Sequence, residues 1–298
     1  MARIHANGIE IEYEISGPAD GVPLLLIHGF GQQLIAWPDE FVDGMVKAGL
    51  RVIRMDNRDV GLTQKWRGIY PDIAGILAAM RDGRKPDAPY TLSDMASDAA
   101  GLLDALGIES AHIAGASMGG MIAQLVALEH VKKARSLIAI FSTPGDLGLP
   151  PSTAEAHKAL TTPSPGNDRA TVIAHTIAGR GAYSSTAFPI NLERMADHIG
   201  RAYDRQYYPE GVLRHWSAIL ASPPRGERLK SLKLPALVLH GSADNLLLPA
   251  HGRRIAECIP GAEYHEIEGW GHDMPVAVIP HLLGFMRSFV EGVEAERK

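Results

Sequence analysis

The first part of the chain carries two kinds of strand pattern. Between residues 9 and 14, apolar side chains alternate with three glutamates, and a repeat of two is typical of a half-exposed strand. Two nearly continuous apolar runs follow at 24–27 and 52–55, with a helical pattern between them at about 38–47. Apolar strands separated by helices indicate a parallel sheet that is covered on both faces.

The same exchange of strands and helices continues toward the C-terminus. Apolar residues recur at helical spacing from Leu92 to Leu106, and Thr91 and Asp94 are placed to form a capping box in front of them. Further strands and helices are expected in alternation at 112–114, 118–129, 136–141, 236–239, 249–259, 264–267 and 276–291. The predicted fold class is therefore α/β.

The segment 144–234 interrupts this alternation and is far longer than one crossover helix requires. Its start is rich in Pro, Ser, Thr and Gly. Helical patterns follow near 170–178, 192–203 and 212–220. We interpret the segment as a mostly helical cap inserted into a core made of residues 1–143 and 235–298. A floppy insertion is the alternative, which the many apolar and aromatic residues disfavour. Residues 64–90 are expected to form an irregular surface excursion.

Composition and charge narrow the possible partners and the compartment. Hydrophobic residues make up 46% and charged residues 21% of the 298 positions, which is ordinary for a chain with a sizeable core. A net charge of −5 without a basic cluster argues against nucleic acid or a membrane surface as partner. The chain has no signal-peptide pattern and no apolar run approaching ~18 residues, so we expect a cytoplasmic protein. The sequence does not predict its oligomeric state. The lone Cys258 cannot form an internal disulfide and is expected to be an inert core residue rather than a catalytic thiol.

A candidate nucleophile lies where an apolar strand turns into a helix. Residues 115–119 read Gly-Ala-Ser-Met-Gly, which matches the G-x-S-x-G pattern in its expected strand–turn–helix context. Glycines at both ends let the turn close where a Cβ would collide, and the helix start offers unpaired N–H groups beside the Ser117 hydroxyl. A helix-capping serine is the alternative for Ser117.

A serine hydroxyl needs a base, and the base needs an orienting acid. Of the 13 histidines, His272 is selected because it lies between the last predicted strand and the last helix, at the same sheet edge as Ser117. Asp244 follows the preceding strand and reaches that edge too. The alternatives are a capping histidine and a turn aspartate, with Asp146 as a second candidate for the acid.

A transition-state oxyanion needs two N–H donors, and two backbone positions are candidates. Met118 N–H lies at the start of the helix after Ser117. Phe30 N–H lies in the turn after the third strand, where the chain reads His28-Gly29-Phe30-Gly31. An ordinary glycine-rich turn is the alternative for residues 28–31.

Together these motifs resemble the α/β-hydrolase superfamily over nearly the whole chain. The resemblance implies an eight-stranded, mostly parallel sheet flanked by helices, with a helical cap. It also implies a catalytic triad of Ser117, Asp244 and His272, with Phe30 and Met118 as oxyanion donors. Residues 56–63, 115–124 and 203–209 resemble the branch that contains aclacinomycin methylesterase and related bacterial carboxylesterases. Many hydrolases carry a D-x-R-x-x-G-x-S pattern after the fourth strand, and Thr63 replaces its usual serine here. We interpret residues 56–63 as mainly structural.

The reaction class follows from the residue at position 117. Epoxide hydrolases and dehalogenases of this fold carry aspartate at this position, so Ser117 argues against both classes. No dinucleotide-binding glycine pattern follows the first strands, which argues against an oxidoreductase. We expect cleavage of carboxylic esters, small or aromatic methyl esters among them, by a serine carboxylesterase that needs no metal or organic cofactor. A C–C bond hydrolase, a cofactor-free perhydrolase or haloperoxidase, and a non-catalytic binding protein remain as alternatives. Aromatic residues that could line the substrate pocket are Trp37, Tyr183, Phe188, Tyr207, Tyr208 and Trp216.

Overall fold

The short apolar runs of the sequence form the strands of one sheet. The computed structural model describes residues 1–297. Its sheet has eight strands in the order β1-β2-β4-β3-β5-β6-β7-β8, with β1–β2 and β2–β4 antiparallel and every other pair parallel. The strands are β1 (Ala2–Ala6), β2 (Ile9–Ser16), β3 (Val22–Ile27), β4 (Leu50–Met55), β5 (Ala111–Ala116), β6 (Ala134–Ile140), β7 (Ala236–Gly241) and β8 (Glu263–Ile267). The predicted α/β fold with a mostly parallel eight-stranded sheet is confirmed.

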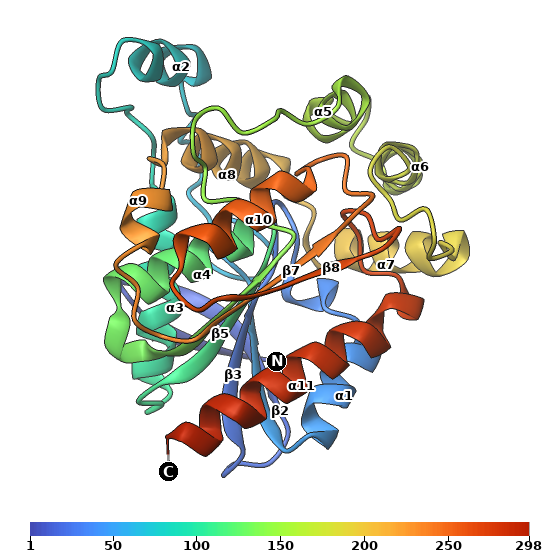
Figure 1. Ribbon diagram of the computed structural model, residues 1–298. Coiled ribbons are helices and arrows are strands. Elements are labelled where there is room, and N and C mark those ends of the chain that lie inside the picture. Colours follow the sequence, from blue (N-terminus) through green and yellow to red (C-terminus); the bar gives the residue numbers. More distant parts are fainter. Residues whose placement is uncertain (298) are drawn as a thin grey trace.

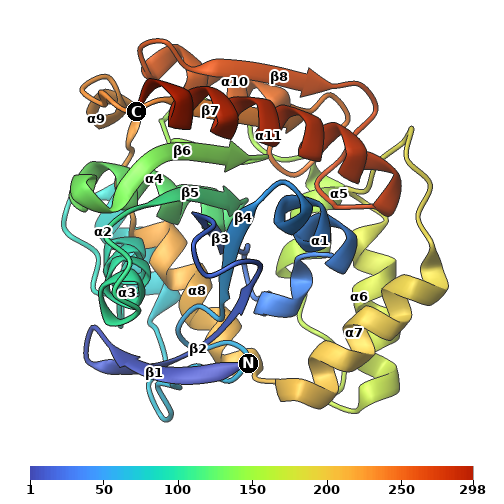
Figure 2. The ribbon, with the colours of Figure 1, turned by 90° about the horizontal axis from the view of Figure 1, so that it is seen from below.

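Helices cover both faces because successive strand residues point to opposite sides. In β3, Leu25 and Ile27 join one buried apolar cluster, whereas Leu24 and Leu26 join the other. The first cluster includes side chains of α3 (Leu92–Ala105), α4 (Met118–Glu129) and α10 (Pro249–Cys258). The second includes α1 (Asp39–Lys47) and α11 (Ile279–Glu296). Figure 2 shows α3 and α4 on one side of the sheet and α1 on the other.

The last helix also meets the length and composition of a membrane span. Residues Val276–Glu296, which include the short 3₁₀ turn η3 (Val276–Val278), have a mean hydropathy of 1.3 in the most apolar window. The sequence analysis expects a helix at 276–291 but no apolar run approaching ~18 residues, because Arg287 and Glu291 interrupt the apolar positions. One face of α11 packs on the sheet through Leu282, Met286 and Phe289, so the helix is part of the core.

The segment 144–234, called the cap segment below, contains five helices. They are α5 (Ala154–Thr161), α6 (Arg169–Arg180), α7 (Leu192–Gln206), α8 (Pro209–Ala221) and α9 (Gly226–Leu229). In Figure 1, α5, α6 and α8 lie above the strands, and α7 lies to their right. The prediction found α6, α7 and α8, and it missed α5 and α9 because both are short.

The excursion at 64–90 also holds a helix, α2 (Ile73–Arg81), which Asp72 caps through the N–H of Gly75. Two more 3₁₀ turns are η1 (Leu34–Ala36) and η2 (Val131–Lys133).

Buried ion pairs fasten the cap segment to the loop after β4. Arg214 of α8 donates to both carboxylate oxygens of Asp59 at 2.8 and 2.9 Å, and both side chains are almost fully buried. Arg205 of α7 donates to Asp56 at 2.6 Å. The Thr63 hydroxyl donates to the Asp56 carbonyl at 2.8 Å and accepts the N–H of Glu12 at 2.9 Å, which links this loop to β2. The segment 56–63 thus has the structural role that its sequence suggested.

Candidate active site

Ser117 lies at the apex of a tight turn between β5 and α4. Its backbone has φ 56° and ψ −119°, in a region that residues other than glycine rarely adopt. A Cβ at Gly115 would collide with the carbonyl of Gly119, and one at Gly119 with the carbonyl of Ile27. The Ser117 N–H donates to the Ile140 carbonyl at 2.9 Å, which holds the turn against the next strand. Backbone atoms on all sides therefore maintain the strained conformation.

The structure brings Ser117, His272 and Asp244 into one hydrogen-bonded row. The Ser117 Oγ lies 2.9 Å from His272 Nε2, and His272 Nδ1 lies 2.7 Å from Asp244 Oδ2. A carboxylate can only accept at Nδ1, so that nitrogen carries the proton and Nε2 is the acceptor for the serine hydroxyl. Asp146, the second candidate acid, instead binds Arg254 at 2.8 Å.

Asp244 is held as a carboxylate by several donors. Its Oδ1 accepts the N–H groups of Leu246 and Leu247 at 2.9 and 2.8 Å. Burial alone would raise the pKa of Asp244, but His272 and His240 lower it below its usual value. His240 Nε2 lies 3.4 Å from Asp244 Oδ2, a contact that the sequence gave no reason to expect.

Two backbone N–H groups, those of Phe30 and Met118, lie in the turns beside Ser117. Among residues 1–297, neither Phe30 N–H nor Met118 N–H donates a hydrogen bond within the protein. The turn that carries Phe30 lies against the serine, since a Cβ at Gly29 would lie 3.2 Å from Ser117 Cβ. Both N–H groups therefore remain available as donors at this edge.

Two buried histidines fix the turn at residues 28–31. His28 Nδ1 donates to the Gly29 carbonyl at 3.2 Å, and its Nε2 accepts the N–H of Asn57 at 3.4 Å. His215 Nε2 donates to the Arg58 carbonyl at 2.7 Å, and its Nδ1 accepts the N–H of Gly31 at 3.3 Å. Burial lowers the pKa of each histidine to about 4, so both rings are neutral near pH 7.

The cap segment contacts the turn that carries His272. The Tyr183 carbonyl accepts the His272 N–H at 2.7 Å, and the N–H groups of Thr186 and Ala187 donate to the Gly269 carbonyl. The Ser185 hydroxyl donates to Asp273, whose pKa is raised by burial. His272 is thus held from the cap side as well as from Asp244.

A cavity of about 880 Å³ opens in front of Ser117. Its lining includes three of the predicted pocket residues, Trp37, Tyr183 and Trp216, and also Phe30. Phe188, Tyr207 and Tyr208 do not line it, which corrects the prediction. Their rings have other partners: Phe188 packs against His281, Tyr207 stacks on Tyr203, and the Tyr208 hydroxyl accepts from Arg214.

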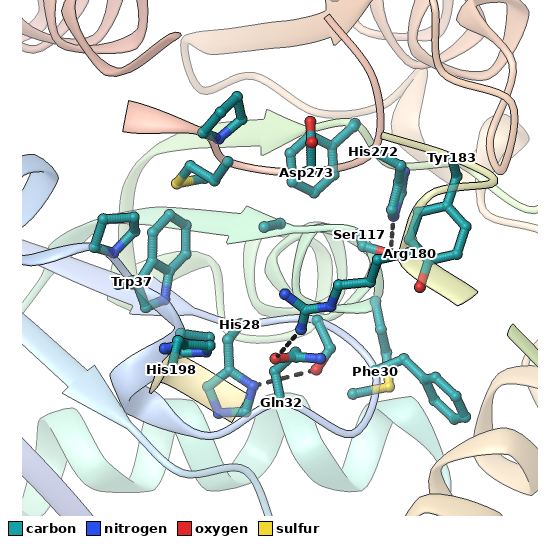
Figure 3. A pocket seen from close by; sticks show the side chains of 18 of the residues that line it. His28, Phe30, Gln32, Trp37, Ser117, Arg180, Tyr183, His198, His272 and Asp273 are labelled. Carbon is teal, nitrogen blue, oxygen red and sulfur yellow. Dashed lines mark hydrogen bonds between the residues drawn. The ribbon is translucent and has the colours of Figure 1, made fainter. Parts of the chain in front are cut away.

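The polar lining of the cavity was missed by the sequence interpretation. Gln32, Arg180, His198 and Asp273 all face it, and Figure 3 shows them around Ser117 and His272. No motif marks these positions. For Arg180 and His198, the inward face of a cap helix depends on how the helix docks on the core. Within the described chain, no group of three or more His, Cys, Asp or Glu residues is arranged to hold a metal ion.

Two curated relatives are similar in sequence to most of this chain, and a solved structure is similar in fold. Rhodomycin D methylesterase DauP of Streptomyces sp. (strain C5) is 29% identical over 291 residues, covering 89% of each protein. A 2-hydroxy-6-oxononadienedioate/2-hydroxy-6-oxononatrienedioate hydrolase of Paraburkholderia phymatum is 27% identical, covering 89% of this chain and 85% of that protein. The solved structure of a mutant of the meta-cleavage product hydrolase CumD from Pseudomonas fluorescens IP01 superimposes with a TM-score of 0.77 over 98% of both chains at 20% identity, which is a likeness of fold.

The likeness to a methylesterase confirms the branch that the sequence motifs suggested. The family model described as alpha/beta hydrolase fold matches residues 22–176, which include the Phe30 turn, the Ser117 turn and the start of the cap segment. The chain belongs to the α/β-hydrolase fold family.

Proposed function

We propose that this protein is a serine carboxylesterase that cleaves carboxylic esters through an acyl-enzyme on Ser117. One observation carries the proposal: the unbroken row from Asp244 through His272 to the Ser117 hydroxyl, with donor–acceptor distances of 2.7 and 2.9 Å. The methylesterase relative supports hydrolysis of an ester as the reaction.

In the first half of the proposed reaction, Ser117 Oγ attacks the ester carbonyl carbon while His272 Nε2 takes the hydroxyl proton. Asp244 stabilises the imidazolium that forms. The carbonyl oxygen becomes an oxyanion that accepts the N–H groups of Phe30 and Met118. When the tetrahedral intermediate collapses, the C–O bond to the alcohol breaks and His272 protonates the departing alkoxide.

In the second half, a water molecule replaces the alcohol. His272 removes a proton from the water as its oxygen attacks the acyl carbon, and the second tetrahedral intermediate expels Ser117 Oγ. His272 returns the proton to the serine, and the carboxylic acid leaves. The reaction consumes one water and needs no cofactor.

The cavity supports a substrate larger than a simple acetate ester. Its volume of about 880 Å³ lies toward the upper end of the ~300–1,000 Å³ usual for small-molecule sites. With the methylesterase relative, this favours bulky or aromatic methyl esters. We include in the proposal that residues 1–143 and 235–298 form the catalytic core, that residues 144–234 act as the cap over the cavity, and that the enzyme works in the cytoplasm.

The proposal is tested with a panel of p-nitrophenyl esters of increasing acyl length beside aromatic methyl esters. For Ser117→Ala we expect kcat to fall by several orders of magnitude, up to ~10⁶ as in another serine hydrolase. A fluorophosphonate probe should label the wild type and leave Ser117→Ala unlabelled. Ester hydrolysis that persists in Ser117→Ala would refute the acyl-enzyme.

A second candidate reaction is C–C bond hydrolysis by the same residues. It is favoured by the relative from Paraburkholderia phymatum, which is a 2-hydroxy-6-oxononadienedioate/2-hydroxy-6-oxononatrienedioate hydrolase. Vinylogous diketones assayed beside the esters, with peroxide-dependent halogenation as a third arm, separate the two reactions and the perhydrolase alternative. A higher kcat/KM on the diketone than on every ester would replace the esterase assignment.

A further inference from the structure

The cavity contains one arginine whose charge is not neutralised by a neighbouring carboxylate. Four arginines line it, and three form ion pairs: Arg54 with Glu14, Arg194 with Glu40, and Arg201 with Asp197. Among the residues that the structure describes, Arg180 forms no ion pair. Its Nη2 donates to the Gln32 side-chain oxygen at 3.1 Å. This neutral partner orients the guanidinium and leaves its charge uncompensated.

Arg180 is attached to both turns that surround Ser117. Its carbonyl accepts the N–H of Tyr183 at 3.2 Å, and the Tyr183 carbonyl in turn accepts the His272 N–H. At the other end of the side chain, Gln32 closes the turn of Gly29, whose carbonyl accepts the Gln32 N–H at 3.2 Å. Figure 3 shows Arg180 projecting into the cavity toward Gln32. The guanidinium therefore lies between the turn that carries His272 and the turn that carries Phe30.

Other polar groups of the cavity do not compete for this charge. Asp273, the carboxylate next to His272, accepts both the hydroxyl and the N–H of Ser185. Burial, together with the positive charges of Arg180 and Arg201, lowers the pKa of His198 to about 4, so His198 is neutral near pH 7. Arg180 therefore keeps a positive charge that no carboxylate of the described residues contacts, although the whole chain carries a net charge of −5.

We propose that Arg180, oriented by Gln32, binds an ionised carboxylate on the acyl part of the ester, so that the preferred substrates are monoesters of dicarboxylic acids. A guanidinium presents five N–H donors in a planar fork, and only one group is engaged with Gln32. The remaining donors match the two oxygens of a carboxylate. The inference rests on the proposed ester hydrolysis at Ser117.

The test compares the monomethyl and dimethyl esters of the same acids, terephthalic, isophthalic and glutaric acid. The measured quantity is the ratio of kcat/KM for the monoester to kcat/KM for the diester. We expect this ratio to fall about 10- to 100-fold in Arg180→Gln, because a hydrogen bond to a charged group is lost, with most of the change in KM. Arg180→Lys, which keeps the charge but not the fork, should retain part of the preference.

The matched control is Arg201→Gln, because Arg201 lines the same cavity but is paired with Asp197 and about half exposed. Its ratio should stay within about twofold of wild type, since exposed pairs contribute little. An unchanged ratio in Arg180→Gln would overturn the carboxylate subsite. Equal loss on both esters would also overturn it and assign the Arg180–Gln32 bond to docking of the cap segment.

Calorimetry separates the subsite from catalysis. Monomethyl terephthalate is titrated into Ser117→Ala and into the Ser117→Ala/Arg180→Gln double variant. Affinity about 10-fold or more weaker in the double variant supports the subsite even if the ester is not hydrolysed. Equal affinity refutes the subsite whatever the fate of the esterase proposal.

Discussion

The hydrogen-bonded row of Ser117, His272 and Asp244 and the lining of the cavity are built in different ways. Ser117, Asp244 and the Phe30 turn lie at the carboxyl ends of sheet strands, where short backbone turns fix each group. Gln32, Arg180 and Tyr183 surround the same space, but two of them come from the cap segment and are positioned by its docking on the core. The first region is determined locally and the second by contacts distant in sequence. We therefore expect variants of the first to affect chemistry, and variants at the junction to affect stability and selectivity.

The largest expected effect comes from the strand-edge region. Asp244→Asn should reduce kcat by ~10⁴-fold, because an amide can donate to Nδ1 and favour the tautomer with the proton on Nε2. The measurement is steady-state hydrolysis of a p-nitrophenyl ester, with near-ultraviolet circular dichroism to verify the fold. The control is Asp204→Asn, at an exposed pair with Arg169 within the cap segment. A drop below tenfold in Asp244→Asn would mean that another group orients His272.

The next effect concerns the junction between the two regions. Arg214→Met leaves the buried Asp59 carboxylate unpaired and should lower the free energy of unfolding by about 3–5 kcal/mol. Urea unfolding followed by tryptophan fluorescence measures it. The double variant Arg214→Met/Asp59→Leu should recover part of the loss, because no isolated charge remains. Wild-type stability in Arg214→Met would show that this pair does not hold the cap segment.

A smaller effect should appear as pH dependence of stability. His28 and His215 have folded-state pKa values of about 4, below the usual 6.5. Between pH 6.5 and 4 the unfolded chain binds more protons than the folded one, so stability falls as the pH is lowered through this range. Each ring contributes at most about 3 kcal/mol. His215→Gln should flatten the dependence of the urea midpoint on pH, and an unchanged slope would contradict the assignment.

The difference between the regions also explains which features the sequence could reveal. Ser117, His272 and Asp244 were identifiable because a strained turn and a strand-edge position require particular residues at particular places. Phe188 and Tyr207 were assigned wrongly because aromatic composition does not say which way a cap residue points. Arg180 and His240 carried no local signal. Arg180 contacts Gln32, which lies far from it in the chain, and His240 contacts Asp244 only once the turn after β7 has folded.

The close contact between the backbones of Gly115 and Gly119 has a consequence for directed evolution of this protein. Any side chain at either position meets main-chain atoms of Gly119 or Ile27, which cannot rotate away as a flexible side chain could. Libraries aimed at new selectivity should therefore leave the Ser117 turn untouched. Diversity belongs on the inner faces of α6 and α7, where sequence can drift while the chemistry stays the same.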